Sequence, residues 1–104
     1  MTTSTESFRD CNTDELLAQI GHAALLFISG GRVRRRASGV TLPVAAGYSV
    51  TVDLDWNDTY VVRRVFKRGD KVTIKGEMRD VYAMEVSEAA IQASSFRSYP
   101  FPKP

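Results

Sequence analysis

Two side chains of the usual catalytic types occur once each in this chain, and neither has the neighbours that catalysis needs. His22, the single histidine, would need a partner that orients its ring, and Glu15 lies about two helical turns away. The single cysteine, Cys11, lies beside Arg9 and Asp10 with no base in reach to lower the pKa of its thiol. We therefore expect His22 and Cys11 to be exposed surface residues without a catalytic role.

Three aspartates surround Trp56 and form the nearest approach to a carboxylate cluster. Asp53 and Asp55 share one face of a predicted strand, where they could bind a hard cation together, and Asp58 follows. Their spacing does not match the EF-hand pattern, so a solvated strand face is the better interpretation. One cysteine allows no internal disulfide and no Cys-rich zinc site. No GxGxxG, P-loop, HExxH, GxSxG or CxxC motif is present, so we expect no catalytic residue, metal site or cofactor.

The basic residues carry the stronger signal, because they are concentrated in two stretches. The chain has 14 Lys and Arg against 12 Asp and Glu, for a formal net charge of +2. No acid occurs between Glu15 and Asp53, and four arginines fall within residues 32–36 of that interval. Seven basic residues and two acids follow between Tyr60 and Arg79. If the two stretches meet in the fold, they form a basic surface that attracts anions.

We predict that this surface binds a partner through ten residues: Arg34, Arg35, Arg36, Tyr60, Arg63, Arg64, Phe66, Lys67, Arg68 and Lys71. An acidic protein surface is the first candidate partner, because the net charge is small for a nucleic-acid-binding protein. Nucleic acid is the second, because arginines contact phosphates and bases could stack between Tyr60, Arg64 and Phe66. The alternative is that these charges only keep a sheet soluble or pair with acids of neighbouring strands.

The first element that would position these residues is a helix from Asn12 to the glycine pair at 30–31. Asn12 is a favourable N-cap, and Glu15 stands where a capping-box acid would stand. Gly21 lies inside the helix and indicates a close backbone contact there. Ser29 falls on the polar side. The apolar residues recur with a helical period on the opposite arc: Leu16, Leu17, Ile20, Ala23, Ala24, Phe27 and Ile28.

Four or five antiparallel strands follow, and the predicted segments are 32–37, 40–44, 48–56, 59–67 and 71–78. Pro43 indicates an edge strand or a bulge in the second segment, and Gly69 closes a hairpin with a positive φ. Arg63 and Arg64 are adjacent, so they point to opposite faces of their strand. One of them must lie on the core side, where a charge needs a partner. In the last segment, the residues expected on the core face are Val72, Ile74, Gly76 and Met78.

A second, short helix is predicted over residues 85–95, and its apolar stripe consists of Val86, Ala89, Ala90, Ala93 and Phe96. Helices outside a run of strands indicate an α+β fold. We expect residues 1–11 to be a flexible tail, 12–98 to form a single domain, and 99–104 to be an extended Pro/aromatic tail. That last segment could dock on a partner or fold back over the sheet.

The composition is that of one ordinary globular domain. Hydrophobic residues make up 43% and charged residues 25% of the chain. No apolar run approaches the ~20 residues that a bilayer span needs, and no signal peptide is indicated. We therefore expect a protein of the cytoplasm, without membrane contact.

The segments NDTYVVRRVF (57–66), VYA (81–83), EVSE (85–88) and ASSFRS (93–98) resemble small proteins encoded by actinobacterial phages, of the mycobacteriophage type. The resemblance covers about residues 13–98, and the segments 15–20 and 42–44 are similar too. It implies expression in a host bacterial cytoplasm during infection. Phage proteins of this kind often bind host proteins or nucleic acid and are seldom catalysts. The resemblance brings no assigned site and no cofactor.

These observations predict a small, non-enzymatic, phage-type binding protein that acts on a host protein through a basic β-hairpin surface. Nucleic-acid binding through the same Arg/Lys face is the alternative, and an enzyme of unknown type is the third possibility. An exposed edge of the sheet could also pair two copies into a homodimer.

Overall fold

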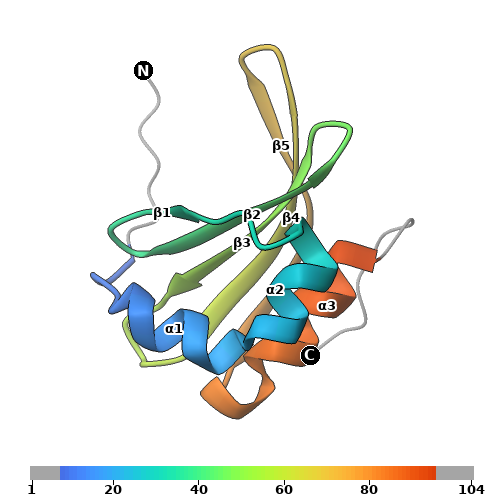
Figure 1. The fold of residues 1–104 in the computed structure, drawn as a ribbon. Coiled ribbons are helices and arrows are strands. Elements are labelled where there is room, and N and C mark those ends of the chain that lie inside the picture. Colours follow the sequence, from blue (N-terminus) through green and yellow to red (C-terminus); the bar gives the residue numbers. More distant parts are fainter. Residues whose placement is uncertain (1–7, 96–104) are drawn as a thin grey trace.

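A computed structural model describes residues 8–95 of the chain. The elements, in order, are α1 (Thr13–Ile20), α2 (His22–Ser29), β1 (Arg34–Arg35), β2 (Gly39–Ala45), β3 (Tyr48–Leu54), β4 (Tyr60–Arg68), β5 (Lys71–Val81), the 3-10 turn η1 (Ala83–Glu85) and α3 (Val86–Ser95). The strands form one antiparallel sheet in the order β1-β2-β3-β4-β5, and the helices cover one face of it (Figure 1). We call this covered face the inner face and the opposite one the outer face.

The predicted α+β fold, with a four- or five-stranded antiparallel sheet and a C-terminal helix, is confirmed, and the sheet has five strands. The predicted Pro/aromatic tail at 99–104 lies outside the described residues, as do residues 1–7 of the predicted N-terminal tail. Residues 8–11 of that tail are bonded to the domain. The Arg9 N–H donates to the Leu54 carbonyl at 2.9 Å, and the Cys11 N–H donates to the Ala37 carbonyl at 2.8 Å.

The predicted single N-terminal helix is in fact two helices that meet at Gly21. Gly21 has φ 91° and ψ 147°, a conformation that favours glycine, and a Cβ there would meet no atom within 4 Å. The glycine therefore supplies a change of backbone direction, and the predicted close contact is wrong. Because the direction changes, α2 turns a different side to the core. Phe27 is 68% exposed, contrary to prediction, whereas Ser29 is buried.

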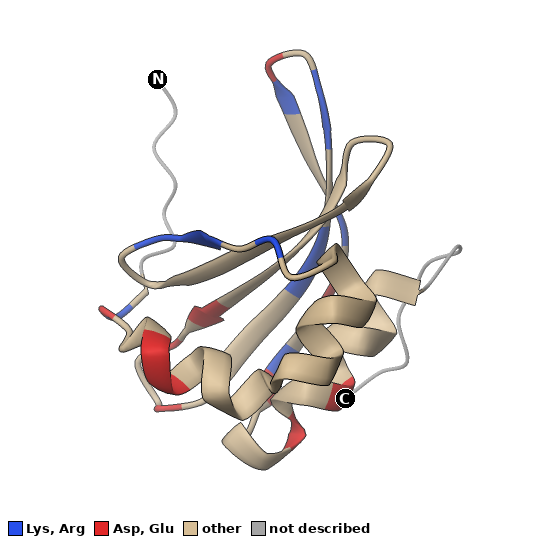
Figure 2. Ribbon diagram, viewed as in Figure 1, with Lys and Arg blue, Asp and Glu red and all other residues tan. Residues whose placement is uncertain are grey.

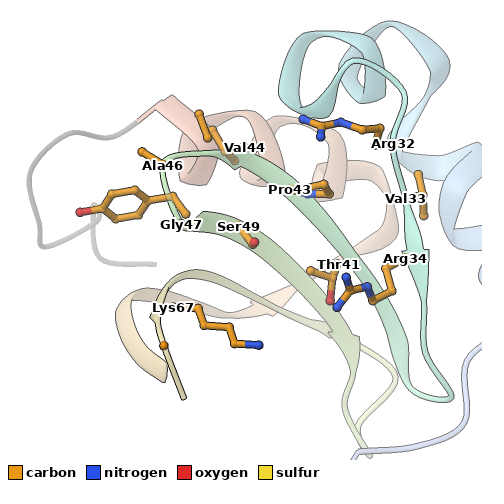
Figure 3. Close-up of a pocket in the computed structure, with 13 residues that line it drawn as sticks. Arg32, Val33, Arg34, Thr41, Pro43, Val44, Ala46, Gly47, Ser49 and Lys67 are labelled. Carbon is orange, nitrogen blue, oxygen red and sulfur yellow. The ribbon is translucent and has the colours of Figure 1, made fainter. Parts of the chain in front are cut away.

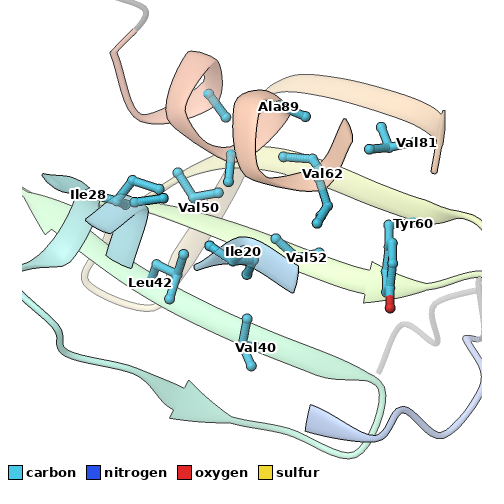
Figure 4. Close-up of a cluster of buried hydrophobic side chains, with 14 of the residues drawn as sticks. Ile20, Ile28, Val40, Leu42, Val50, Val52, Tyr60, Val62, Val81 and Ala89 are labelled. Atoms are coloured by element: carbon cyan, nitrogen blue, oxygen red, sulfur yellow. The ribbon is translucent and has the colours of Figure 1, made fainter. Parts of the chain in front are cut away.

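The hydrophobic core lies between the helices and the inner face of the sheet. Figure 4 shows Ile20 and Ile28 of the helices lying over the sheet residues Leu42 and Val50. The helices α1 and α2 contribute a row of every fourth residue: Leu16, Ile20, Ala24 and Ile28. Each fully buried Val, Leu or Ile contributes about 1.5–3 kcal/mol relative to an exposed side chain. Of the five residues predicted for the apolar stripe of the C-terminal helix, Val86, Ala89, Ala90 and Ala93 are buried as predicted, and Phe96 lies outside the described residues.

Two tight turns and one bulge shape the ends of the strands. Gly69, in the turn between β4 and β5, has φ 61°, as predicted. The turn between β2 and β3 has positive φ at both Ala46 (54°) and Gly47 (88°), as type I′ hairpins require. A Cβ on Gly47 would come within 2.8 Å of the Lys67 carbonyl, so this turn is pressed against β4. The bulge predicted at Pro43 is confirmed by a register shift there.

A second bulge changes which residues of β5 face the core. The register of β4 and β5 shifts between Arg64 and Val65, where Lys75 is an extra residue of β5. Because side chains alternate along a strand, the extra residue reverses the faces on the hairpin side of it. Val72 and Ile74 therefore lie on the outer face, where they are 57% and 51% exposed. The prediction that they belong to the core face is wrong.

Candidate functional site

The structure separates the predicted contact residues into those that bind their own chain and those that face solvent. Three of the arginines form ion pairs: Arg35 with Asp14 at 2.6 Å, Arg36 with Asp53 at 2.7 Å, and Arg63 with Glu77 at 2.6 Å. A guanidinium already paired with a carboxylate attracts a further anion less strongly. These three residues therefore contribute little to a basic binding surface.

Arg64 is used inside the domain. Its guanidinium donates to the Ala93 carbonyl at 2.7 Å and to the Ser94 carbonyl at 3.0 Å, at the C-terminal end of α3. It also lies 4.3 Å from the centroid of the Tyr48 ring. Arg64 is thus the member of the arginine pair that lies on the core side and has partners there, as we predicted. It holds α3 against the sheet rather than facing a partner.

The two aromatic residues predicted to stack on bases have contacts of their own. Tyr60 is only 7% exposed, and its hydroxyl donates to the Gln19 side-chain oxygen at 2.8 Å. Phe66 packs on Tyr48 with the ring centroids 4.8 Å apart. Because a base cannot reach the ring of Tyr60, the predicted stacking between Tyr60, Arg64 and Phe66 is not supported by the geometry.

The remaining predicted residues are Arg34, Lys67, Arg68 and Lys71, which are all exposed. None of them forms an ion pair with another residue of the described range 8–95. The predicted contact set left out Arg32, whose Nε donates to the Ser29 carbonyl at 3.1 Å. Figure 2 shows these charges on β1, on the chain before it and along the β4–β5 hairpin, whose tip also carries the acid Asp70. Other acids lie on α1 and at the far end of β3. We call Arg32, Arg34, Lys67, Arg68 and Lys71 together the basic surface.

Three residues of the basic surface, Arg32, Arg34 and Lys67, line a hollow of about 730 Å³, which we call the basic groove. In Figure 3, Arg34 and Lys67 extend toward one another from opposite sides of it, and Arg32 lies at one end. The hydroxyls of Thr41 and Ser49 lie between them. None of the described lining residues is acidic. The groove can therefore hold a carboxylate or phosphate without repulsion from its own walls.

The local backbone explains why the groove is open. The glycines at 30–31 have φ 66° and 87° and turn the chain away from the end of α2. Only Arg34 and Arg35 then pair with β2, so the chain at Arg32 stands apart from that strand. On the other side, the Lys67 N–H donates to the Gly47 carbonyl at 2.9 Å and fixes β4 as the second wall.

The three aspartates near Trp56 do not form a cluster. Each has a cation of its own: Asp53 pairs with Arg36, Asp55 with Arg79, and Asp58 with Arg9. Asp53 is buried, so the solvated face predicted for it is wrong. Within residues 8–95, no three His, Cys, Asp or Glu side chains are grouped so that they could hold a metal ion. Nor does any helix there have the length and apolar character that crossing a bilayer requires.

His22 is exposed, as predicted, but Cys11 is partly buried against the core. Burial raises the pKa of the Cys11 thiol above its ordinary 9.0, and the negative charges of Asp53 and Glu15 add to the shift. Burial also raises the pKa of Tyr60 above its ordinary 10.0, with smaller contributions from Cys11 and Glu15. Cys11 is therefore a poor nucleophile at neutral pH.

These two shifts predict that the domain loses stability at alkaline pH. Cys11 and Tyr60 hold their protons more firmly in the folded chain than in the unfolded one, so the unfolded chain loses protons first. The contribution of these two groups to the free energy of unfolding should be constant below about pH 8 and fall as the pH rises through 9–10. Urea unfolding at pH 7.5 and 10 measures the fall. Cys11→Ala should show a smaller one, and an equal fall would contradict a contribution from Cys11.

The groove is basic and has no acid among its described lining residues, and the hairpin next to it carries Arg68 and Lys71 on its other face. Fewer of the predicted basic residues face solvent than the sequence indicated, because Arg35, Arg36, Arg63 and Arg64 bind their own chain. Arg32, which was not predicted, belongs to the basic surface. Comparison with known proteins adds no family to this description: no family model matches the chain, and no similar curated protein or solved structure was found.

Proposed function

We propose that this chain is a binding protein whose basic surface engages an acidic segment of a partner protein. The observation that supports this is the position of the cations without described acid partners. Arg32, Arg34 and Lys67 line one hollow of about 730 Å³ on the outer face of the sheet. Arg68 and Lys71 add positive charge on the inner face of the adjoining hairpin. Cations that share a concave surface focus the electric field and raise the association rate of anionic ligands.

The lining of the groove favours a protein over a nucleic acid. Proteins that bind single strands combine a cationic track with aromatic rings on which bases stack. Tyr48 is the aromatic residue among the described lining residues, and Arg64 already covers its ring. Apolar side chains such as Val33 and Val44 line the rest of the groove and suit amino-acid side chains. The resemblance to phage-encoded proteins would make the partner a host protein.

Fluorescence anisotropy with labelled poly-glutamate and with a labelled DNA strand of equal charge tests the proposal. We expect poly-glutamate to bind more tightly at low salt. Lys67→Glu should weaken that binding about tenfold, because it places an acid in the groove. Arg35→Glu is the matched control: it changes the net charge equally but lies outside the groove lining, and it should have a smaller effect.

Equal losses in the two variants would show that only net charge matters and would overturn the groove as the binding site. Tighter binding of DNA, with an affinity that falls steeply as salt is added, would replace the proposal with the nucleic-acid alternative.

A further inference from the structure

The strand β5 lies at one edge of the sheet, and its first half is open along that edge. The strand order gives β5 a described neighbour, β4, on one side only. Figure 1 shows the β4–β5 hairpin extending beyond the helices and the rest of the sheet. An edge strand presents backbone N–H and C=O groups to any extended segment that approaches it.

The turn geometry identifies which backbone groups point outward. Arg68 and Lys71 are paired across a two-residue turn, so they form the hydrogen-bonded pair that closes the hairpin. In an antiparallel ladder such pairs alternate with pairs that make no bonds to each other. Val72 and Ile74 belong to the second kind, and their N–H and C=O groups are directed away from β4.

The side chains beside these groups are apolar on one face and basic on the other. Val72 and Ile74 are 57% and 51% exposed on the outer face. Lys71 alternates with Val72 and so lies on the inner face, and the Lys75 ammonium lies 5.9 Å from the ring centroid of Phe66, on that same face. Neither lysine forms an ion pair with a described residue.

The charges of Lys71 and Lys75 favour an acidic strand over a second copy of this chain at the edge of β5. Two copies of the chain that paired Val72 with Ile74 would place Lys71 opposite Lys75 twice, and like charges directly opposite are destabilising. An acidic strand would place its carboxylates beside these lysines instead. The bulge at Lys75 ends the regular stretch, so about four residues, Lys71–Ile74, are open to pairing.

We propose that the acidic segment binds by strand addition to Lys71–Ile74 of β5, with apolar residues on the outer face alternating with acidic residues on the inner face. This inference rests on the proposed function and names how the partner is held. The backbone hydrogen bonds supply affinity, and the alternating side chains supply selectivity.

The test uses two blocked heptapeptides, Glu-Val-Glu-Val-Glu-Val-Glu and the same peptide with each Val replaced by Pro. Both carry the same carboxylates, but the second lacks the N–H groups at the valine positions and cannot form a regular strand. We expect the first peptide to slow amide hydrogen exchange at Val72 and Ile74 at least about tenfold and to leave Thr73 unchanged. The second peptide should give no such protection.

A variant provides an independent measurement. Ile74→Pro removes an outward N–H without removing a bond to β4, and it should abolish binding of the valine peptide while poly-glutamate still binds in the groove. Equal binding of both peptides without protection of Val72 and Ile74 would overturn strand addition and leave the proposed function standing. Protection of these amides in the free protein, together with a dimer in sedimentation, would assign the edge to a second copy and also overturn it.

Discussion

Asp53→Ala is expected to lower the free energy of unfolding by about 3 kcal/mol, because it leaves a partly buried arginine without its counterion. Asp53 is 4% exposed, and one of its oxygens accepts bonds from the Arg36 guanidinium and from the Ser38 hydroxyl, each at 2.7 Å. Arg36 also donates to the Val40 carbonyl at 2.8 Å. The carboxylate thus joins the outer faces of β2 and β3 to the turn that precedes them.

Urea unfolding of three variants measures this contribution. Asp53→Asn keeps an oxygen that accepts from Ser38 and should lose less stability than Asp53→Ala, by about 1 kcal/mol or more. Asp55→Ala is the control: its carboxylate lies 3.6 Å from Arg79 in a partly exposed pair, so its loss should be below about 1 kcal/mol. Equal losses at positions 53 and 55 would contradict a special role for the buried pair.

The burial of Asp53 shows a limit of sequence patterns. Asp53 alternates with Val52 and Leu54, and this alternation correctly places it on the outer face. What the alternation cannot show is which distant residues lie over that face. Here the backbone N–H groups of Arg9 and Cys11 donate to the carbonyls of Leu54 and Ala37, which brings residues 8–11 next to the strand end that holds Asp53. Such coverage depends on contacts between residues far apart in sequence, whereas alternation reports only local geometry.

The fold was more predictable than the site, because periodic patterns determine the helices and most strands. The exceptions occur where one residue shifts the repeating pattern of buried and exposed positions. Gly21 divides a continuous helical pattern because its φ is 91°, and Lys75 reverses the alternation of β5 because it is an extra residue in the ladder. Neither event leaves a distinctive local sequence: glycine also occurs within helices, and Lys75 continues a regular alternation.

The site was predictable in its charge but not in its individual residues. The two basic stretches do supply the basic surface, since Arg34, Lys67, Arg68 and Lys71 belong to it. Whether an arginine faces solvent or an acid depends on strand register, however. Arg63 lies directly opposite Glu77 because the bulge at Lys75 shifts the register of β4 and β5. The spacing of these residues along the chain does not reveal this register. Only the assembled sheet separates paired arginines from exposed ones.

Arg64 illustrates the difference most clearly, and it carries the second large prediction. Arg64→Ala should lower the free energy of unfolding by about 2 kcal/mol, because the end of α3 loses a charged donor to two carbonyls and Tyr48 loses its cation–π contact. Arg64→Lys should recover only part of the loss. A lysine is a point charge on a flexible stem and does not reproduce the planar guanidinium over the ring.

The matched control is Arg68→Ala, at an exposed position of the same strand. Its effect on stability should be below about 0.5 kcal/mol, while its binding of poly-glutamate should weaken. Arg64→Ala should show the reverse, a loss of stability with binding unchanged under conditions where the variant is fully folded. If Arg64→Ala instead weakened binding without destabilising the fold, Arg64 would belong to the binding surface after all. The assignment of its guanidinium to the end of α3 would then be wrong, since one side chain cannot hold these carbonyls and a partner's carboxylate in the same conformation.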